Sequence, residues 1–428
     1  MPSIKSIAVI GLGYVGLPIA LLASKKSFKV FGIDNDPKKL KSLSEKKSYL
    51  GDVTDEEIKK TKVIFTDDAS KVSSVDAVII CVPTPVSPEK VPNLGPVIGA
   101  VSAVAPYLKK GTLVVIESTV NPGVCDEVVK PLLEKKSRKK VGRDIYLAHC
   151  PERINPGDSK WNVSNINRVV GANSKPELDM AVKLYESLID AKIKPMGSIK
   201  EAEAVKIVEN SFRDINIAFV NELAMSFHKL GINLENVIDG AATKPFAFMP
   251  HHPGCGVGGH CIPVDPYYLI EYAHNHGFEH DFLSLARKIN ESMPQFTVDL
   301  LIEALNEIGL PLKNTKVALL GLSYKANVGD DRESPARVIK DLLLDAGANL
   351  TTYDPYLKND STVASLEKAL NSATAVVIAT GHDEFKNGLS PKRLRDSGIK
   401  IVIDGRNLLK NNKKILKDIG ISYHGIGV

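Results

Sequence analysis

Cysteine and tryptophan are scarce in this sequence, which has five cysteines and one tryptophan among 428 residues. The cysteines, at positions 81, 125, 150, 255 and 261, are odd in number and show no framework spacing. This pattern argues against a secreted fold held together by disulfides, because such folds carry paired and regularly spaced cysteines. We therefore expect reduced thiols and a cytoplasmic protein.

An excess of one charge is also lacking. The chain has 55 basic and 50 acidic residues, which gives a formal net charge of +5. Its most basic segment, residues 130–143, is interrupted by Glu134 and contains no aromatic residue. A solvated helix end accounts for that segment better than a nucleic-acid-binding surface does. No nucleic-acid partner is expected.

Long uncharged stretches are rare, and one of them needs an explanation. Ile7–Ser24 is uncharged and follows Lys5, as the core of a leader or membrane segment would. It also contains three glycines at fixed spacing, and Asp34 follows it, which suits a different purpose described below. Neither a targeting segment nor a membrane partner is predicted.

The composition that is present, 43% apolar and 25% charged, is that of a globular protein with two or three domains. Short apolar runs alternate with helical segments in the first third and again after Leu312, which predicts parallel α/β sheets. The expected strands are Ser6–Ile10, Lys29–Ile33, Lys62–Phe65, Ala77–Cys81, Thr112–Glu117, Asp144–Ala148, Lys316–Leu320, Asn349–Tyr353, Ala375–Ala379 and Ile399–Ile403. Ser334–Ala346 is expected to be a helix.

The middle of the chain has a helical pattern instead. Between Glu201 and Leu230 apolar residues recur every three or four positions, and neither Pro nor Gly interrupts them. That spacing predicts one long amphipathic helix whose apolar stripe either crosses the molecule or packs against a second copy. Further helices are expected at Pro266–Asn275 and Ser284–Ile308.

A glycine fingerprint follows the first expected strand. Gly11, Gly13 and Gly16 match G-x-G-x-x-G between a strand and a helix, and Asp34 ends the next strand. The first glycine permits a tight turn, the second lets a pyrophosphate approach, and the third lets helix and strand pack closely. A carboxylate at position 34 suits a ribose 2′-hydroxyl and repels a 2′-phosphate, which indicates NAD rather than NADP. FAD is the alternative cofactor.

The segment His251–Pro266 is the densest in reactive residues. Three His and two Cys suggest a metal site, but the Cys255/Cys261 spacing and the adjacent His260 match no usual zinc arrangement. Two further readings remain: a glycine-rich loop with an inert cysteine, and a nucleophilic Cys261 whose glycines let a substrate approach. The glycines alone fit both.

Other polar residues point to a site at the strand ends. Lys206 and Asn210 lie one turn apart on the long helix and share a face, although a lysine on such a helix is most often solvated. Glu117–Thr119 and Pro151–Arg153 each follow an expected strand, at the sheet edge where α/β ligand sites gather.

The ordered set of motifs resembles the UDP-glucose/GDP-mannose dehydrogenase family of nucleotide-sugar 6-dehydrogenases over nearly the whole chain. The motifs are VIGLGYVGLPIA, CVPTP (81–85), ESTVNPG (117–123), PERINPG (151–157), AEAVKIVENSF (202–212), GGHCIPVDP (258–266) and GLSYKANVGDDRESP (321–335). The resemblance implies an α/β fold, with two Rossmann-like domains joined by a long central helix and a helical middle domain. It implies an NAD-binding domain at 1–200, a central domain at 201–311 with a dimerisation helix (201–230) and the cysteine loop, and a UDP-sugar-binding domain at 312–428.

The resemblance also implies a reaction, the oxidation of the sugar C6 alcohol to a uronate through a thioester on Cys261. Lys206 would stabilise or deprotonate the alkoxide, Asn210 and Asp265 would position a water, and Thr119 and Glu152 would serve that water. The implied NAD contacts are Gly11, Gly13, Tyr14, Val15, Gly16, Asp34, Pro83, Thr84 and Thr119. The implied substrate contacts are Glu152, Arg153, Lys206, Asn210, Gly258, Lys325 and Arg332, and no metal is expected.

Two departures from the UDP-glucose-specific pattern bear on the substrate. Pro156 stands where a second acidic residue is usual, and Val264 stands where a lysine is usual. The forms around Arg153, Thr243–Phe248 and Cys261 resemble the branch that acts on UDP-N-acetylhexosamines. UDP-N-acetylglucosamine is therefore expected, with the manno and galacto epimers and UDP-glucose as alternatives.

Two other functions fit part of the pattern. A two-electron dehydrogenase of the 3-hydroxyacid type could share the glycine fingerprint and the Lys206/Asn210 pair. A non-catalytic nucleotide-sugar-binding protein could share both α/β domains, but it would be expected to lack Cys261 or Lys206, and both are present.

Overall fold

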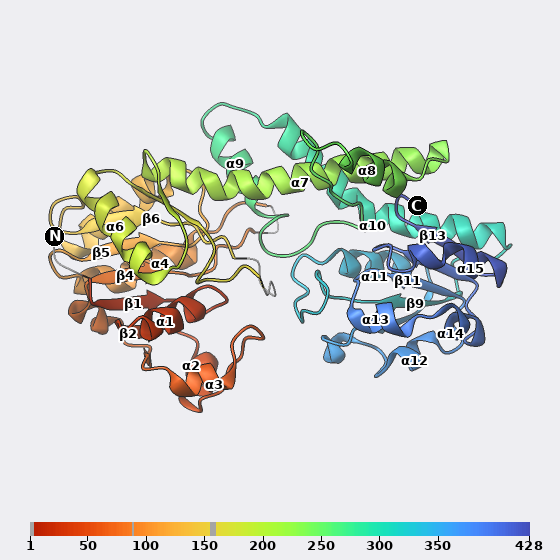
Figure 1. The fold of residues 1–428 in the computed structure, drawn as a ribbon, viewed down its shortest axis with the longest axis horizontal. Coiled ribbons are helices and arrows are strands. Elements are labelled where there is room, and N and C mark those ends of the chain that lie inside the picture. The colour runs from red at the N-terminus through yellow and green to blue at the C-terminus, as the bar shows by residue number, and fades with distance from the viewer. Residues whose placement is uncertain (1–3, 88–89, 155–159) are drawn as a thin grey trace. The chain divides into compact units, whose positions relative to one another are not determined.

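The computed structural model describes residues 4–87, 90–154 and 160–428. Two compact units make up the chain (Figure 1). Unit 1 comprises Met1–Glu209 and Tyr267–Glu279, and unit 2 comprises Asn210–Pro266 and His280–Val428. Residues of the expected middle domain are thus shared between the two units.

Unit 1 is built on an eight-stranded sheet in the order β3-β2-β1-β4-β5-β6-β7-β8. Its strands are β1 (Ser6–Ile10), β2 (Lys29–Ile33), β3 (Ile64–Thr66), β4 (Ala77–Ile80), β5 (Leu113–Ile116), β6 (Tyr146–His149), β7 (Arg168–Ala172) and β8 (Ile193–Pro195). Every neighbouring pair is parallel except β6 and β7, which are antiparallel. The first six strands have the order 3-2-1-4-5-6 of a dinucleotide-binding sheet.

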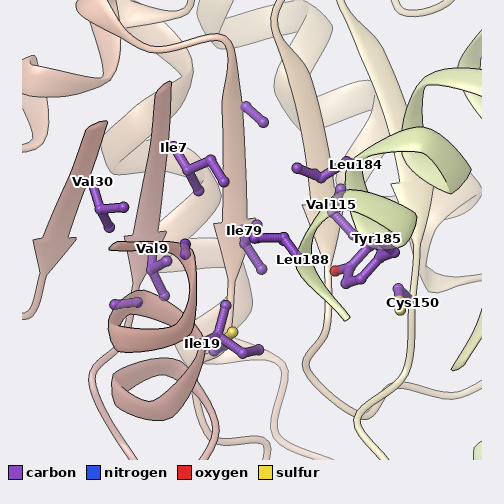
Figure 2. Packing of buried hydrophobic residues seen from close by; sticks show 14 of the residues in the cluster. Ile7, Val9, Ile19, Val30, Ile79, Val115, Cys150, Leu184, Tyr185 and Leu188 are labelled. Atoms are coloured by element: carbon purple, nitrogen blue, oxygen red, sulfur yellow. The ribbon is translucent and has the colours of Figure 1, made fainter. Parts of the chain in front are cut away.

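Alternation along the strands of unit 1 divides its core between two faces. Ile7 and Val9 pack with α1 (Gly16–Lys25) and α6 (Lys175–Leu188), as Figure 2 shows for Ile19, Leu184 and Leu188. The intervening residues of β1 pack on the other face with α4 (Gly95–Val104) and α5 (Lys130–Ser137). Both faces are covered by helices, which is why these strands are apolar at nearly every position.

Unit 2 contains a five-stranded, fully parallel sheet in the order β10-β9-β11-β12-β13. The strands are β9 (Lys316–Leu320), β10 (Asn349–Tyr353), β11 (Ala375–Ile378), β12 (Ile401–Asp404) and β13 (Ser422–Gly425). One face packs on α10 (Asp281–Glu307) and α11 (Pro335–Asp345). The other packs on α12 (Leu366–Leu370), α13 (Asp383–Gly388), α14 (Pro391–Asp396) and α15 (Lys413–Asp418). The α/β fold with two Rossmann-like sheets is confirmed.

The long helix is α7 (Ile199–Leu230), which continues without a break from unit 1 into unit 2. Its predicted apolar stripe is only partly covered: Val208, Phe212, Phe219 and Leu230 are each 50–64% exposed. The remaining helices are α2 (Pro37–Ser44), α3 (Asp55–Lys60), α8 (Leu234–Ala242) and α9 (Asp265–His274). None of the helices in the described ranges is both long and apolar enough to cross a membrane.

The two sheets repeat one detail of backbone geometry. In unit 1, Gly11 (φ +88°) follows β1, and the next residue, Leu12, donates its N–H to Asp34 Oδ2 at 2.7 Å. In unit 2, Gly321 (φ +89°) follows β9, and Leu322 donates its N–H to Asp354 Oδ2 at 2.7 Å. Asp34 follows β2, which pairs with β1, and Asp354 follows β10, which pairs with β9.

Candidate functional site

The glycine loop of unit 1 has the geometry that a dinucleotide requires. Gly11 has a left-handed φ of +88°, and a Cβ there would lie 2.9 Å from the Cys81 carbonyl oxygen. A Cβ on Gly16 would lie 1.8 Å from the Gly11 oxygen, so only glycine lets α1 start this close to β1. Gly13 is different, because a Cβ there would meet no atom within 4 Å. The second glycine therefore faces open space, as a position approached by a pyrophosphate must.

Asp34 lies at the end of β2, where the fingerprint predicts it. It is 6% exposed, and it accepts N–H groups from Leu12 at 2.7 Å and Asp36 at 2.9 Å and the ammonium of Lys39 at 3.0 Å. Burial raises the pKa of Asp34, but these three donors outweigh burial and hold it below the usual value. A carboxylate kept ionised here suits a ribose hydroxyl and repels a phosphate. Lys39 was not predicted, since its role depends on the turn after Asp34.

The predicted NAD contacts beyond the glycines lie on loops at the same sheet edge. Tyr14 is 37% exposed and Val15 is half-buried, both within the turn that leads into α1. Pro83 and Thr84 follow β4, and the Tyr268 hydroxyl donates to the Thr84 carbonyl. The residues present thus fit a dinucleotide: a helix that starts directly after a tight glycine turn, open space at the second glycine and an ionised acceptor.

A second loop of this edge carries Thr119. It follows β5, and the neighbouring Ser118 hydroxyl donates to the Val82 carbonyl at 2.7 Å, which ties it to the β4 loop. Thr119 is half-buried. At the far end of this loop, Glu203 of α7 accepts the N–H groups of Gly123 at 2.6 Å and Cys125 at 2.8 Å. Sequence reasoning missed Glu203, although it lies three positions before Lys206.

The segment Pro151–Arg153 docks on α7 through two ion pairs. Lys206 Nζ lies 3.5 Å from Glu152 Oε2, and these residues are 6% and 9% exposed. Arg153 pairs with Glu209 and donates to the Asn167 carbonyl at 2.9 Å. Lys206 is therefore buried against a carboxylate rather than solvated. Glu209 is a further residue that the sequence did not reveal.

The remaining predicted residues belong to unit 2. Cys261 is half-buried, and its carbonyl accepts the N–H groups of Val264 at 3.0 Å and Asp265 at 2.8 Å, so the chain turns into α9 directly after the cysteine. The Asp265 carboxylate accepts a hydrogen bond from the Asn210 side chain, and both are buried. These two residues therefore contact each other within this unit, and their predicted role of positioning a water stays a prediction.

The glycines before Cys261 have a structural reason of their own. Cβ atoms on Gly258 and Gly259 would lie 2.8 Å from atoms of Tyr324, and the Gly259 N–H donates to the Arg332 carbonyl at 3.0 Å. The loop thus packs tightly on the segment 321–335. This packing accounts for Gly258 without a substrate contact.

Segment 321–335 also carries the two predicted diphosphate contacts. Lys325 is half-buried, and Arg332 is exposed. The Arg332 guanidinium pairs with Asp330 at 2.6 Å and lies 3.1 Å from His260 Nδ1. Among the predicted site residues, unit 1 therefore holds Thr119, Glu152, Arg153 and Lys206, and unit 2 holds Asn210, Gly258, Cys261, Asp265, Lys325 and Arg332. Pro156, which bears on the substrate, lies outside the described residues.

Among the residues that the structure describes, ligand-type side chains also gather at one place away from the cysteine loop. Cys125, His149 and Glu203 each bring one such atom within 4.8 Å of the others, and all are buried. Burial lowers the pKa of His149 to about 3 and raises that of Cys125, which leaves a neutral ring and a protonated thiol. The Glu203 carboxylate already accepts two backbone N–H groups, so the three side chains form a buried polar cluster and not a site with open coordination positions. In unit 2, the Cys255 thiol donates to the Ala379 carbonyl at 3.3 Å. The expectation of no metal stays a prediction.

The fold and the glycine loop define a class of protein, an α/β oxidoreductase that binds NAD. Family models identify it further: residues 5–189 match the NAD binding domain of the UDP-glucose/GDP-mannose dehydrogenase family, residues 200–292 its central domain and residues 318–411 its UDP binding domain. The chain belongs to this family, and it is an NAD-dependent UDP-sugar dehydrogenase.

Individual relatives extend over the whole chain. UDP-N-acetyl-D-mannosamine dehydrogenase of Pyrococcus horikoshii is 37% identical and aligns over 98% of this chain and 99% of its own length. UDP-N-acetyl-D-glucosamine 6-dehydrogenase of Pseudomonas aeruginosa is 34% identical over 96% and 99%. The solved structure of the UDP-D-ManNAc dehydrogenase from Pyrococcus horikoshii has a TM-score of 0.91 and covers 99% of each chain at 37% identity.

Proposed function

We propose that this protein oxidises the C6 hydroxymethyl group of a UDP-N-acetylhexosamine to the carboxylate, through a thioester on Cys261. The observation that carries the proposal is the position of Cys261, half-buried where the chain turns into α9. The start of a helix carries a partial positive charge, which favours a thiolate. Membership of the dehydrogenase family supplies the reaction class.

The proposed route divides the oxidation into two halves. Bound NAD supplies a hydride acceptor for each. Lys206 stabilises the alkoxide of the C6 alcohol, and after the first oxidation Cys261 adds its sulfur to the C6 aldehyde to give a thiohemiacetal. Lys206 also stabilises the negative charge on the thiohemiacetal oxygen, and the second oxidation leaves a thioester.

Hydrolysis completes the reaction. Asn210, Asp265 and Thr119 hold the water, and Glu152 takes its proton as the oxygen bonds to C6. The C–S bond then breaks, and the proton passes to the sulfur. The buried Lys206–Glu152 and Asn210–Asp265 pairs support these roles, because each places a charged or polar group where solvent is excluded.

For the sugar, we propose UDP-N-acetylglucosamine first and UDP-N-acetylmannosamine as its nearest competitor. The N-acetylhexosamine forms of the sequence motifs support both, and the two relatives described above are named for one sugar each. UDP-N-acetylgalactosamine and UDP-glucose complete the test panel. The uronate product would suit the biosynthesis of a polysaccharide.

The test counts NADH at 340 nm for each sugar in that panel. Two NADH per sugar supports the thioester route. One would indicate a two-electron dehydrogenase, and none with any sugar would indicate a binding protein. Cys261→Ser should abolish steady turnover, whereas the matched Cys255→Ser, whose buried thiol contacts Ala379, should retain it. Near-normal activity of Cys261→Ser contradicts the assignment.

We further infer a division of labour and an assembly. Residues 1–200 bind NAD, 201–311 carry the catalytic cysteine loop and the dimerisation helix, and 312–428 bind the UDP-sugar. The exposed apolar side chains along α7 support a homodimer formed through that helix. The odd number and irregular spacing of the five cysteines support a reducing, cytoplasmic location.

A further inference from the structure

A fully buried ion pair lies beside Glu152 in unit 1. Arg168, the first residue of β7, places Nη1 3.5 Å from Oε2 of Glu117, which follows β5, and neither side chain is exposed. The Tyr185 hydroxyl donates to the other oxygen of Glu117 at 2.5 Å. The pair therefore connects β5, β7 and α6 inside the unit.

Stability alone does not account for this pair. Within the described residues, Arg168 Nε and Nη2 and Glu117 Oε2 are buried without a hydrogen-bond partner. Burying two charges with incomplete hydrogen bonding is costly, and apolar residues of similar volume often serve stability as well or better. A charged pair retained at such a cost points to a task beyond packing.

The polar contacts of the pair lead to the backbone around Glu152. Arg168 Nη1 donates to the Pro151 carbonyl at 3.4 Å, immediately before Glu152. The Glu152 N–H donates to the Glu117 carbonyl at 3.3 Å. Both members of the pair thus hold the turn that presents the Glu152 carboxylate to Lys206.

The side chains of Arg168 and Glu117 also affect the electrostatic environment of the Glu152 carboxylate. Arg168 from β7 and Lys206 from α7 are positive, and Glu117 after β5 is the carboxyl group that Arg168 faces. Burial raises the pKa of Glu117, while Arg168 and the Tyr185 hydroxyl oppose that rise. The other titratable groups around the pair are Cys81 after β4, Cys150 after β6 and Tyr185 on α6, and burial raises the pKa of all three, so they stay neutral. The charged groups around Glu152 are therefore Lys206, the Arg168–Glu117 pair and the Arg153–Glu209 pair next to it in the chain.

We propose that Glu117 and Arg168 are positioning residues for Glu152, fixing its turn and balancing the charge around the carboxylate that serves the hydrolytic water. The assignment rests on the proposed function only in taking Glu152 as the group that assists hydrolysis. In that step the water oxygen bonds to C6, its proton passes by way of Glu152 to sulfur, and the C–S bond breaks. Misplacing Glu152 slows this step and leaves the two oxidations before it intact.

The first test uses Arg168→Lys, which keeps the charge but removes Nη1, the guanidinium nitrogen that reaches both the Pro151 carbonyl and Glu117 Oε2. We expect a burst of two NADH per active site followed by turnover at least tenfold slower than wild type. Intact-mass spectrometry of the quenched enzyme should show the acyl adduct on Cys261. The KM values for NAD and UDP-sugar should change less than threefold. An adduct-free enzyme, or a loss confined to KM, overturns the proposal.

The second test separates charge from shape through the acid limb of the kcat–pH profile. Glu117→Gln removes the carboxylate that faces Arg168, so the positive charge of Arg168 is no longer compensated. This charge favours the ionised form of Glu152, and the acid limb should therefore move to lower pH by about half a unit or more. The double variant with Arg168→Met removes both charges and should move the limb back toward wild type. Tyr185→Phe, which loses a hydrogen bond and no charge, should leave it in place. A limb that stays fixed in Glu117→Gln, or moves further in the double variant, contradicts the charge-balancing role.

The failure of this proposal and that of the proposed function differ in the wild-type enzyme. Two NADH per sugar in the wild type establishes the four-electron route whatever the variants do. If the wild type gives one NADH and no adduct, the proposed function fails and the burst of two in Arg168→Lys cannot occur. If Glu117→Gln does not fold, Arg168→Lys still tests the positioning role by itself.

Discussion

At the scale of single residues, the three fingerprint glycines make separable contributions. Gly16→Ala would place a Cβ 1.8 Å from the Gly11 carbonyl oxygen, so we expect a loss of about 1–3 kcal/mol in unfolding free energy. Gly13→Ala meets no atom in the protein. It should leave the melting temperature unchanged and raise the KM for NAD about tenfold, because the methyl group occupies the space of the pyrophosphate. Thermal melts and NAD titrations of both variants check this, and a destabilised Gly13→Ala would contradict it.

A buried carboxylate gives a prediction about pH. Burial raises the pKa of Glu203 from 4.5 to about 7 despite the N–H groups of Gly123 and Cys125. A group whose pKa is raised on folding contributes stability below pH 4.5 and loses it as pH rises through about 7. In that window the loss should be about 1.4 kcal/mol per pH unit. Glu203→Gln removes this slope.

Urea midpoints at pH 5 and pH 8 measure that slope. The difference between the two pH values should be smaller in Glu203→Gln than in wild type. The matched control is Glu201→Gln, on the same helix with an exposed side chain, which should keep the wild-type difference. Equal differences in all three proteins would show that Glu203 is ionised throughout the range.

Sequence reasoning reached the reactive residues more readily than the residues that hold them. Cys261, Lys206 and Asp34 could be selected by residue type and motif. Arg168 and Glu203 could not, because a buried charge is recognised only by what it faces, and those neighbours come from distant strands. Glu117 was named for its place after a strand, without its partner. The glycines beside Cys261 suggested room for a substrate, whereas they pack against Tyr324.

At the scale of elements, apolar runs between turn residues located most strands, and β1, β2, β9 and β10 have the predicted bounds. Three strands were missed. β7 begins with Arg168 and contains Gly171, β8 is a three-residue edge strand ending in Pro195, and β13 has the mixed sequence Ser422–Gly425. None of these has an apolar run or a strict alternation, because tertiary pairing rather than local pattern defines them.

The exposed stripe on α7 gives a prediction for this element. Phe219→Asp puts a charge among the side chains that we propose to pack against a second copy, so the mass by light scattering should fall toward that of one chain. Leu344→Asp, at a comparably exposed position on α11, should leave the mass unchanged. A dimer that persists in Phe219→Asp would place the interface elsewhere.

At the scale of the whole molecule, the two units have separate hydrophobic cores, so heating need not unfold them together. We expect calorimetry to resolve two transitions. NAD should raise one of them and UDP the other, each by the free energy of binding to the folded unit. Gly16→Ala should lower the NAD-responsive transition alone. A single transition that responds equally to both ligands would show that the units unfold as one.

The repeated strand–glycine–leucine geometry has a consequence for the order of events in catalysis. In unit 2 the carboxylate that corresponds to Asp34 is fully buried, and its Oδ2 also binds two side chains, the Ser323 hydroxyl at 2.7 Å and His382 Nε2 at 3.1 Å. Residues 321–334 then separate β9 from α11, where unit 1 has a short glycine turn. The second sheet thus has the strand and glycine geometry of a dinucleotide site, but the carboxylate at the position of the ribose acceptor is buried and bonded to protein groups. Within the described residues, only the first sheet then has a complete dinucleotide site, while the proposed route removes two hydrides. That route therefore predicts that spent cofactor is exchanged halfway through each turnover. The proposed covalent bond to Cys261 would keep the half-oxidised sugar on the enzyme during that exchange.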